Sequence, residues 1–251
     1  MNAPALEARG LTRHFGALIA TDNVSFKIRP GARQALIGPN GAGKTTLINL
    51  LTGVIKPTAG QVLLQGRDVT HLASSGRVRK GLSRTFQINQ LFPDLTSAES
   101  LGLAISERNG SGADFWRPAG SRPAIVAEIA ELLTHFGLEA EMDRPTRKLA
   151  YGKQRLLEIA LALASRPRVL LLDEPAAGVP EEERRDILAA LAALPSDVAV
   201  LLIEHDMDLV FNFADRISVL VAGRLLTEGT PEAIAADERV RAVYLGEDAH
   251  A

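Results

Sequence analysis

The pattern of hydrophobic and polar positions divides the chain into three stretches. Up to about residue 87, short apolar or alternating runs bounded by turn residues predict strands, such as Asn23 to Ile28 and Ala35 to Ile37. Between about residues 88 and 164, apolar residues recur at helical spacing: Ile125, Ile129, Leu132, Leu133 and Phe136. From about residue 165 onward, predicted strands and helices alternate again. The pattern therefore predicts an α/β domain into which a helical lobe is inserted.

The last stretch has the clearest strand signals. Val169 to Leu172 and Val198 to Ile203 are continuous apolar runs, which are typical of parallel strands buried on both faces. An Ala- and Leu-rich segment, Glu181 to Leu194, predicts the helix between them, and Ile217 to Val221 predicts a further strand. We expect one domain over residues 1–251, with the α/β core at about 1–87 and 165–251 and the helical lobe at about 88–164.

Composition argues against several classes of protein. Lys and Arg number 28 against 30 Asp and Glu, a formal net charge of -2, so the basic excess of a sequence-independent nucleic-acid binder is missing. The chain has no cysteine, which excludes disulfides and thiolate metal sites and suits a reducing compartment. The longest apolar run, Ile187 to Leu194, is far shorter than the roughly 18 to 20 residues of a membrane-spanning helix. We expect a cytoplasmic chain, without a secretion signal, that reaches a membrane only through partner proteins.

A glycine-rich segment predicts a phosphate-binding loop. It reads Gly38-Pro39-Asn40-Gly41-Ala42-Gly43-Lys44-Thr45 and fits the pattern G-x-x-x-x-G-K-[ST] between a predicted strand and a predicted helix. In such a loop, backbone N–H groups and the helix N-terminus face the phosphate oxygens. Lys44 is expected to reach the β- and γ-phosphates of ATP, and the Thr45 hydroxyl to bind Mg²⁺. We assign this segment, together with Thr46, to ATP binding.

Two carboxylates supply the second half of such a site. Asp173 and Glu174 come directly after the apolar run that ends at Leu172. Taken alone, an acidic pair at this position is usually just a strand end that enters solvent. Downstream of a phosphate loop, we expect Asp173 to bind the magnesium ion and Glu174 to polarise the attacking water.

Further segments, in a fixed order, make the chain resemble the ABC ATPases. They are Thr85-Phe86-Gln87, the signature-like segment Leu149-Ala150-Tyr151-Gly152-Lys153-Gln154-Arg155, and Leu201-Leu202-Ile203-Glu204-His205-Asp206. The resemblance covers essentially the whole chain. It implies a P-loop NTPase fold with a mixed or parallel sheet core, an N-terminal antiparallel β subdomain and an inserted helical lobe. It also implies ATP hydrolysis in a dimer, where each nucleotide lies between the phosphate loop of one subunit and the signature of the other.

The resemblance carries roles onto individual residues. Gln87 is expected to contact Mg²⁺ and the attacking water, Glu174 to act as the base, and His205 to contact the γ-phosphate. Phe15 stands where the family places an aromatic residue that stacks on adenine, although packing in the core is an equal alternative. The residues expected to face the nucleotide of the partner subunit are Ala150, Tyr151, Gly152, Lys153 and Gln154.

Other segments narrow the resemblance to the LivG-type ATPases of branched-chain amino acid uptake systems. They include Arg84-Thr85-Phe86-Gln87, Asp173-Glu174-Pro175-Ala176-Ala177-Gly178 and Tyr244-Leu245-Gly246-Glu247. An importer of this kind implies a second ATPase subunit, membrane permease subunits and, indirectly, a periplasmic solute-binding protein. A related ATPase for urea, amides or another solute, or a non-transport ABC ATPase, remains an alternative. A small-molecule P-loop kinase is disfavoured because its chemistry requires neither the signature-like segment nor His205.

Three positions depart from the family pattern. Ala150 stands where a serine donates to the γ-phosphate, Lys153 where the signature usually has glutamine, and Pro180 where an acidic residue or its amide is usual. The phosphate loop and the acidic pair are intact. One hypothesis is that the chain pairs with a different ATPase and that the nucleotide site completed by Ala150 is the weaker one. The alternatives are that Ala150 is a tolerated variant and that the chain pairs with itself.

Overall fold

The computed structural model describes residues 3–85, 91–110 and 122–245, and its contacts divide the chain into two units. The first unit contains Met1–Leu82, Arg168–Glu174 and Pro195–Ala251. The second contains Ser83–Pro167 and Pro175–Leu194. The second unit thus takes in the segment after Glu174 as well as the predicted helical stretch. The proposed division into a core and a lobe stays a prediction.

An antiparallel sheet of four strands forms one layer of the first unit. Its order is β2 (Leu18–Ile28), β1 (Leu6–Phe15), β4 (Ala59–Leu64) and β5 (Arg67–Asp68), and every neighbouring pair is antiparallel. In β2, buried Val24, Phe26 and Ile28 alternate with exposed residues. This period of two gives the sheet one apolar face, as the alternating run in the sequence predicts.

The other described sheet is mixed and has six strands. Its order is β10 (Arg224–Gly229), β9 (Arg216–Val221), β3 (Arg33–Ile37), β8 (Ala199–Ile203), β7 (Val169–Asp173) and β6 (Leu82–Arg84). The pairs β3–β8, β3–β9 and β7–β8 are parallel, whereas β9 and β10 form an antiparallel hairpin. Strands β7 and β8 are buried along their whole length. The predicted fold class, a mixed or parallel core beside an antiparallel sheet, is confirmed.

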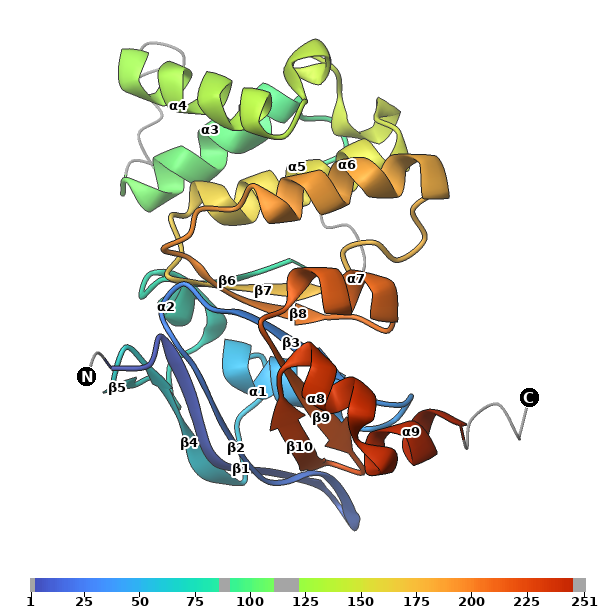
Figure 1. Cartoon of the computed structure of the whole chain (residues 1–251). Coiled ribbons are helices and arrows are strands. Elements are labelled where there is room, and N and C mark those ends of the chain that lie inside the picture. Colours follow the sequence, from blue (N-terminus) through green and yellow to red (C-terminus); the bar gives the residue numbers. More distant parts are fainter. Residues whose placement is uncertain (1–2, 86–90, 111–121, 246–251) are drawn as a thin grey trace. The chain divides into compact units, whose positions relative to one another are not determined.

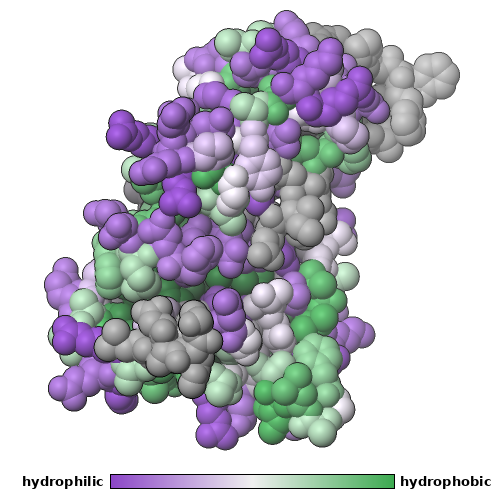
Figure 2. Space-filling model, turned by 90° about the vertical axis from the view of Figure 1, so that its right-hand side faces the viewer, coloured by the Kyte–Doolittle hydropathy of each residue, from purple (hydrophilic) through white to green (hydrophobic). Residues whose placement is uncertain are grey.

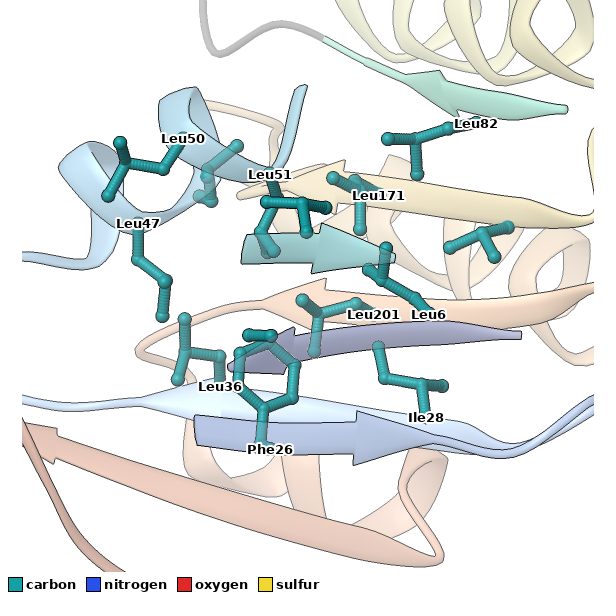
Figure 3. Close-up of a cluster of buried hydrophobic side chains, with 14 of the residues drawn as sticks. Leu6, Phe26, Ile28, Leu36, Leu47, Leu50, Leu51, Leu82, Leu171 and Leu201 are labelled. Carbon is teal, nitrogen blue, oxygen red and sulfur yellow. The ribbon is translucent and has the colours of Figure 1, made fainter. Parts of the chain in front are cut away.

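Helix α1 (Lys44–Thr52) packs its apolar residues against strands of both sheets. Leu47 and Leu51 of α1 belong to the same buried cluster as Phe26 of the antiparallel sheet and Leu36 and Leu201 of the mixed sheet (Figure 3). Burying a leucine side chain contributes roughly 1.5 to 3 kcal/mol. This cluster therefore holds the start of α1, and with it the end of the glycine-rich loop, in a fixed place.

The alternate residues of β3 face a second cluster. Ala35 and Ile37 pack with apolar residues of α7 (Met207–Phe213), α8 (Pro231–Ala236) and α9 (Glu238–Leu245). Successive side chains of a strand point to opposite faces, so β3 contributes to a core on each side. Helix α2 (Ser74–Val78) completes the described helices of this unit (Figure 1).

In its described residues, the regular structure of the second unit is helical apart from Ser83 and Arg84 of β6. Its helices are α3 (Ser97–Arg108), α4 (Pro123–His135), α5 (Tyr151–Ala164) and α6 (Glu181–Ala192), with short 3₁₀ turns at Glu139–Glu141 and Thr146–Lys148. Thr96 and Glu99 form a capping box at the start of α3, which satisfies two N–H groups of its first turn. Figure 1 shows α3 and α4 side by side, and Arg108 and Glu128 join them through an ion pair of 2.6 Å.

Polar side chains cover most of the face drawn in Figure 2, with apolar residues gathered in patches between them. Among the described residues, none of the helices has the length and apolar character needed to cross a membrane.

Candidate functional site

The glycine-rich loop joins β3 to α1, as the sequence predicts. Gly43 has a φ of 99°, and a Cβ atom there would lie 2.3 Å from the carbonyl oxygen of Ala20, so glycine is required. The loop is also held from outside, because Gly223 N–H donates to the Ala42 carbonyl at 2.9 Å. Asp22 N–H in turn donates to the Gly223 carbonyl at 2.8 Å. Strand β2 and the turn between β9 and β10 thus fix the shape of the loop.

Lys44 is the first residue of α1 and folds back over the loop. Its Nζ donates to the carbonyl oxygens of Gly38 at 2.5 Å and Pro39 at 3.0 Å. The N-cap of α1 is Gly43, which supplies no side-chain acceptor for the first N–H groups of the helix. An anion at this helix start would gain both those N–H groups and the ammonium group.

Because the strands are parallel, the other residues predicted to act on ATP lie at the same edge of the mixed sheet. Leu36 of β3 is paired in register with Ile203 of β8, and Ile203 with Asp173 of β7. The loop after β3, the acidic pair after β7 and His205 after β8 therefore all leave from the carboxyl ends of neighbouring strands. This edge is where open α/β sheets bind ligands.

Glu174 and His205 lie close together at that edge. The distance from Glu174 Oε1 to His205 Nδ1 is 3.8 Å, and the Glu174 side chain is 22% exposed. Glu174 has a φ of 48°, a left-handed value that is unusual for a residue with a side chain, and its N–H donates to the Ile203 carbonyl at 2.9 Å. Backbone strain of this kind concentrates at functional sites.

Glu204 is a further acidic residue at this edge to which the sequence interpretation gave no role. Its side chain is 1% exposed, and Glu204 Oε2 lies 3.8 Å from His205 Nδ1 and accepts a hydrogen bond from His205 N–H at 3.1 Å. The sequence signal that points to Glu204 is its position directly after a predicted apolar strand.

The residues predicted to bind Mg²⁺ have suitable chemistry. Asp173 is buried at the end of β7, and Thr45 presents an exposed hydroxyl in the first turn of α1. The described residues contain no group of three His, Cys, Asp or Glu side chains that could hold a metal ion by themselves. Mg²⁺ is typically bound by one or two carboxylates together with substrate phosphates and water, so this sparse set fits it. Gln87, the third predicted ligand, lies outside the described residues.

Phe15 ends β1 and is 45% exposed, so its ring is not a core residue. The guanidinium carbon of Arg13 lies 4.6 Å from the centre of the ring. Leu18 and Ile19, at the start of β2, are exposed as well. These residues form an apolar tip with an aromatic ring available for stacking, while its role in binding adenine stays a prediction.

The signature-like segment forms the start of α5, in the second unit. Ala150 is the N-cap, and Tyr151, Gly152, Lys153 and Gln154 form the first turn. Gly152 N–H donates to Glu183 Oε2 at 2.7 Å, and Gln154 Nε2 donates to the Leu149 carbonyl at 3.0 Å. Pro180 is the N-cap of α6.

Comparison with known proteins identifies the family. The model of the family described as "ABC transporter" matches residues 21–177, which include the glycine-rich loop, the signature-like segment and the acidic pair. The chain belongs to the ABC transporter family. Residues 224–250 of this ABC ATPase also match the model described as "Branched-chain amino acid ATP-binding cassette transporter".

Relatives of this ABC ATPase match it along almost its whole length. It is 41% identical to the high-affinity branched-chain amino acid transport ATP-binding protein BraF of Pseudomonas aeruginosa, over 98% of this chain and 100% of the relative. It is 40% identical to the corresponding protein LivG of Escherichia coli (strain K12), with the same coverage. These matches confirm the predicted family resemblance.

Solved structures agree with the fold. A nucleotide-free ATP-binding cassette from an ABC transporter superposes with a TM-score of 0.83 and 29% identity, covering 96% of this chain and 98% of the other. The ADP conformation of the cassette MJ1267 superposes with a TM-score of 0.83 and 29% identity, covering 97% and 99%. The chain is thus an ATP hydrolase of the ABC type, which excludes a small-molecule kinase.

Proposed function

We propose that this chain is the ATP-hydrolysing subunit of an importer for branched-chain amino acids. The ATPase part of the proposal depends on the glycine-rich loop, Glu174 and His205 leaving neighbouring strands at one edge of the sheet. The transported class is supported by the match of residues 224–250 and by the printed functions of BraF and LivG.

The glycine-rich loop binds the triphosphate of ATP. Lys44 exchanges the carbonyl oxygens of Gly38 and Pro39 for the β- and γ-phosphates, and the first N–H groups of α1 add further donors. The hydroxyl of Thr45 and the carboxylate of Asp173 would hold Mg²⁺. When bound, this ion neutralises negative charge on the phosphates. Phe15 stacks on the adenine, since its ring is exposed at the end of β1.

Glu174 orients the attacking water and receives its proton. The water oxygen forms a bond to the γ-phosphorus while the bond to the bridging oxygen of ADP breaks, which releases ADP and inorganic phosphate. His205 binds a γ-phosphate oxygen from the adjacent strand end, and the 3.8 Å gap between the two side chains leaves room for a bridging group. A contact of Gln87 with the water and the metal ion is proposed only from the resemblance to the family.

The second ATPase subunit completes this site with its own signature, and the start of α5 does the same for the nucleotide of that subunit. Because Ala150 has no hydroxyl to donate, the two sites of a heterodimer are unequal. A lost hydrogen bond to a charged group is worth about 1.5 to 3 kcal/mol.

The partners place the chain at the inner face of the cell membrane, on permease subunits that meet a periplasmic solute-binding protein. Phe92, which follows the segment that contains Gln87, is 65% exposed and is a candidate contact for a permease loop.

The test compares two variants of the complex purified with its permease subunits. Lys44→Ala should abolish Mg²⁺-dependent ATP binding, because the loop loses the cation that would bind the β- and γ-phosphates. Lys80→Ala, which removes an exposed lysine after α2, should bind normally. In proteoliposomes, ATP hydrolysis should rise with binding protein loaded with leucine, isoleucine or valine. A rise with urea or acetamide instead would reassign the solute, and ATP binding that survives Lys44→Ala would refute the site.

A further inference from the structure

The first turn of α5 already holds an anion from its own chain. Gly152 N–H donates to the carboxylate oxygen Oε2 of Glu183 at 2.7 Å, and both residues belong to the second unit. The contact is close enough that a Cβ atom on Gly152 would lie 2.2 Å from the same oxygen. Gly152 is buried and Glu183 is half-buried. A charge-assisted hydrogen bond of this length is a strong one.

Ala150 explains why the carboxylate of another helix is needed there. The N-cap residue of a helix usually accepts a hydrogen bond from the second or third N–H group, through a serine, threonine or aspartate side chain. In α5 the N-cap is Ala150, which makes no such bond, and Gly152 is the second residue of the helix. Glu183 therefore supplies the acceptor that Ala150 lacks, at the positive end of the helix dipole.

A second contact ties the same turn to α6. Lys153 Nζ lies 3.5 Å from Asp186 Oδ2, one turn further along α6 from Glu183. Glu183 itself is fixed in the first turn of α6, where its N–H donates to the Pro180 carbonyl at 3.0 Å. The carboxylate is thus held in place by the helix that carries it, at a defined position over α5.

We propose that Glu183 competes with the terminal phosphate of the nucleotide for the N–H group of Gly152. This inference rests on the proposed function, in which the start of α5 faces ATP bound by the second ATPase subunit. One N–H group cannot serve both acceptors, and a carboxylate at this point repels a phosphate. The side chain of Glu183 must swing away before the two subunits close on ATP. Glu183 therefore sets the ATP concentration at which closure occurs.

The chemistry of the phosphate loop does not involve Glu183. Removal of the Glu183 carboxylate should lower the apparent KM for ATP and leave kcat nearly unchanged. A residue with a purely structural role would instead lower the amount of folded enzyme at every ATP concentration. Glu182 is a matched control, because it carries the same charge in the same turn of α6 but is exposed.

The experiment measures ATPase rate against Mg²⁺-ATP concentration for the complex assembled with its permease and partner ATPase subunits. Glu183→Gln should lower the half-saturating ATP concentration by at least about threefold, since one charged competitor is removed. Glu183→Asp keeps the charge on a shorter side chain that no longer reaches Gly152, and should give a smaller decrease. Glu182→Gln should match the wild type.

Two results would overturn the inference. One is an unchanged half-saturating concentration in Glu183→Gln, and the other is an equal decrease in Glu182→Gln, which would show an effect of net charge alone. The NMR signal of the Gly152 amide proton in the isolated chain should move upfield in Glu183→Gln. An unchanged chemical shift would contradict the hydrogen bond between Gly152 and Glu183. Failure of the proposed function looks different, because ATP hydrolysis by the wild-type complex would then not depend on Lys44.

Discussion

The carboxylate of Glu174 lies 3.8 Å from Nδ1 of His205, at the ends of two parallel strands. The distance is too long for a direct hydrogen bond and leaves both groups able to bind a third one between them. The register of β7 and β8 creates this arrangement, since Asp173 is paired with Ile203, β7 ends directly before Glu174 and β8 ends two residues before His205. The left-handed φ of 48° at Glu174 shows that the backbone leaves the extended conformation of the strand at this residue.

Glu174→Gln should therefore separate ATP binding from hydrolysis. Glutamine preserves the shape of the side chain but cannot take the proton of water, so the rate should fall by at least about 100-fold. Affinity for Mg²⁺-ATP should stay within about twofold of the wild type, because the phosphate loop is intact. Phosphate release and equilibrium nucleotide binding measure the two effects. Glu238→Gln, an exposed change in α9, is the control, and wild-type turnover in Glu174→Gln would exclude the assigned role.

Two glycines of the phosphate loop make a second matched pair. Gly41 and Gly43 both have positive φ values, 76° and 99°, so alanine strains the backbone at either position. Only at Gly43 would the new Cβ collide with a carbonyl, that of Ala20 at 2.3 Å, whereas at Gly41 nothing lies within 4 Å. Gly43→Ala should reduce the free energy of unfolding of the nucleotide-free protein by about 1 to 3 kcal/mol more than Gly41→Ala. Equal decreases in the free energy of unfolding of the two variants, measured with urea, would show that the backbone relieves the collision at no cost.

Much of the local structure around the proposed nucleotide site could be predicted because its signals are local in the sequence. The apolar strand, the glycine-rich loop and the helix that starts at Lys44 lie within one short segment, and the structure has them in that order. Asp173 and Glu174 follow a strand whose unbroken apolar run already indicated burial. Parallel strands bring their carboxyl ends to one edge, so the meeting of these segments follows from the fold class.

The features of the site that the sequence does not predict depend on contacts between distant segments. Nothing near Gly152 in the sequence indicates that Glu183, on another helix, accepts its N–H. Nothing near the phosphate loop indicates the support that Ala42 receives from Gly223. Such contacts depend on how helices and turns pack, for which periodicity carries no information. The exposure of Phe15 was undecided for the same reason, since an aromatic residue at a strand end fits either a core or a surface.

The ion pair between Arg108 and Glu128 predicts how the second unit responds to acid. Arg108 Nη1 and Nη2 donate to the two carboxylate oxygens of Glu128 at 2.6 and 2.8 Å, and both side chains are 17% exposed. The hydrogen bonds from Arg108 lower the pKa of Glu128 below the ordinary glutamate value of 4.5. A lowered pKa in the folded state stabilises the protein above pH 4.5, and this contribution is lost as the pH falls through the folded value.

Glu128→Gln should accordingly destabilise the second unit near pH 7 by about 1 to 3 kcal/mol, because Arg108 keeps its charge without an ionised partner. The difference from the wild type should shrink at pH values below the pKa of Glu128. Urea unfolding followed by circular dichroism across this pH range measures it. Glu131→Gln, an exposed change on the same helix, should leave both the stability and its pH dependence unaltered, and a difference that persists unchanged in acid would contradict the linkage.

Arg77 of α2 is 1% exposed and supports the far end of α1. Its guanidinium group donates to four backbone carbonyls, those of Leu50, Leu51, Thr70 and Leu72, at distances from 2.6 to 3.1 Å. The first two are carbonyls of the last turn of α1, where the following N–H donors of a helix run out, and the Leu50 carbonyl also accepts from Gly53 N–H at 3.3 Å. Burial lowers the pKa of Arg77 to about 10, so the group stays charged at neutral pH.

Arg77→Lys should destabilise the protein by about 2 to 4 kcal/mol, since one ammonium group cannot reach acceptors spread around a planar guanidinium. Arg77→Met should cost at least as much, because it removes every guanidinium donor from these four carbonyls. Arg79→Lys, an exposed change just after α2, is the control for both. As α1 begins at Lys44, loosening its last turn should also weaken Mg²⁺-ATP binding, by less than Lys44→Ala does. Thermal unfolding and ATP titration of the three variants measure this, and wild-type stability in Arg77→Met would show that water replaces the guanidinium.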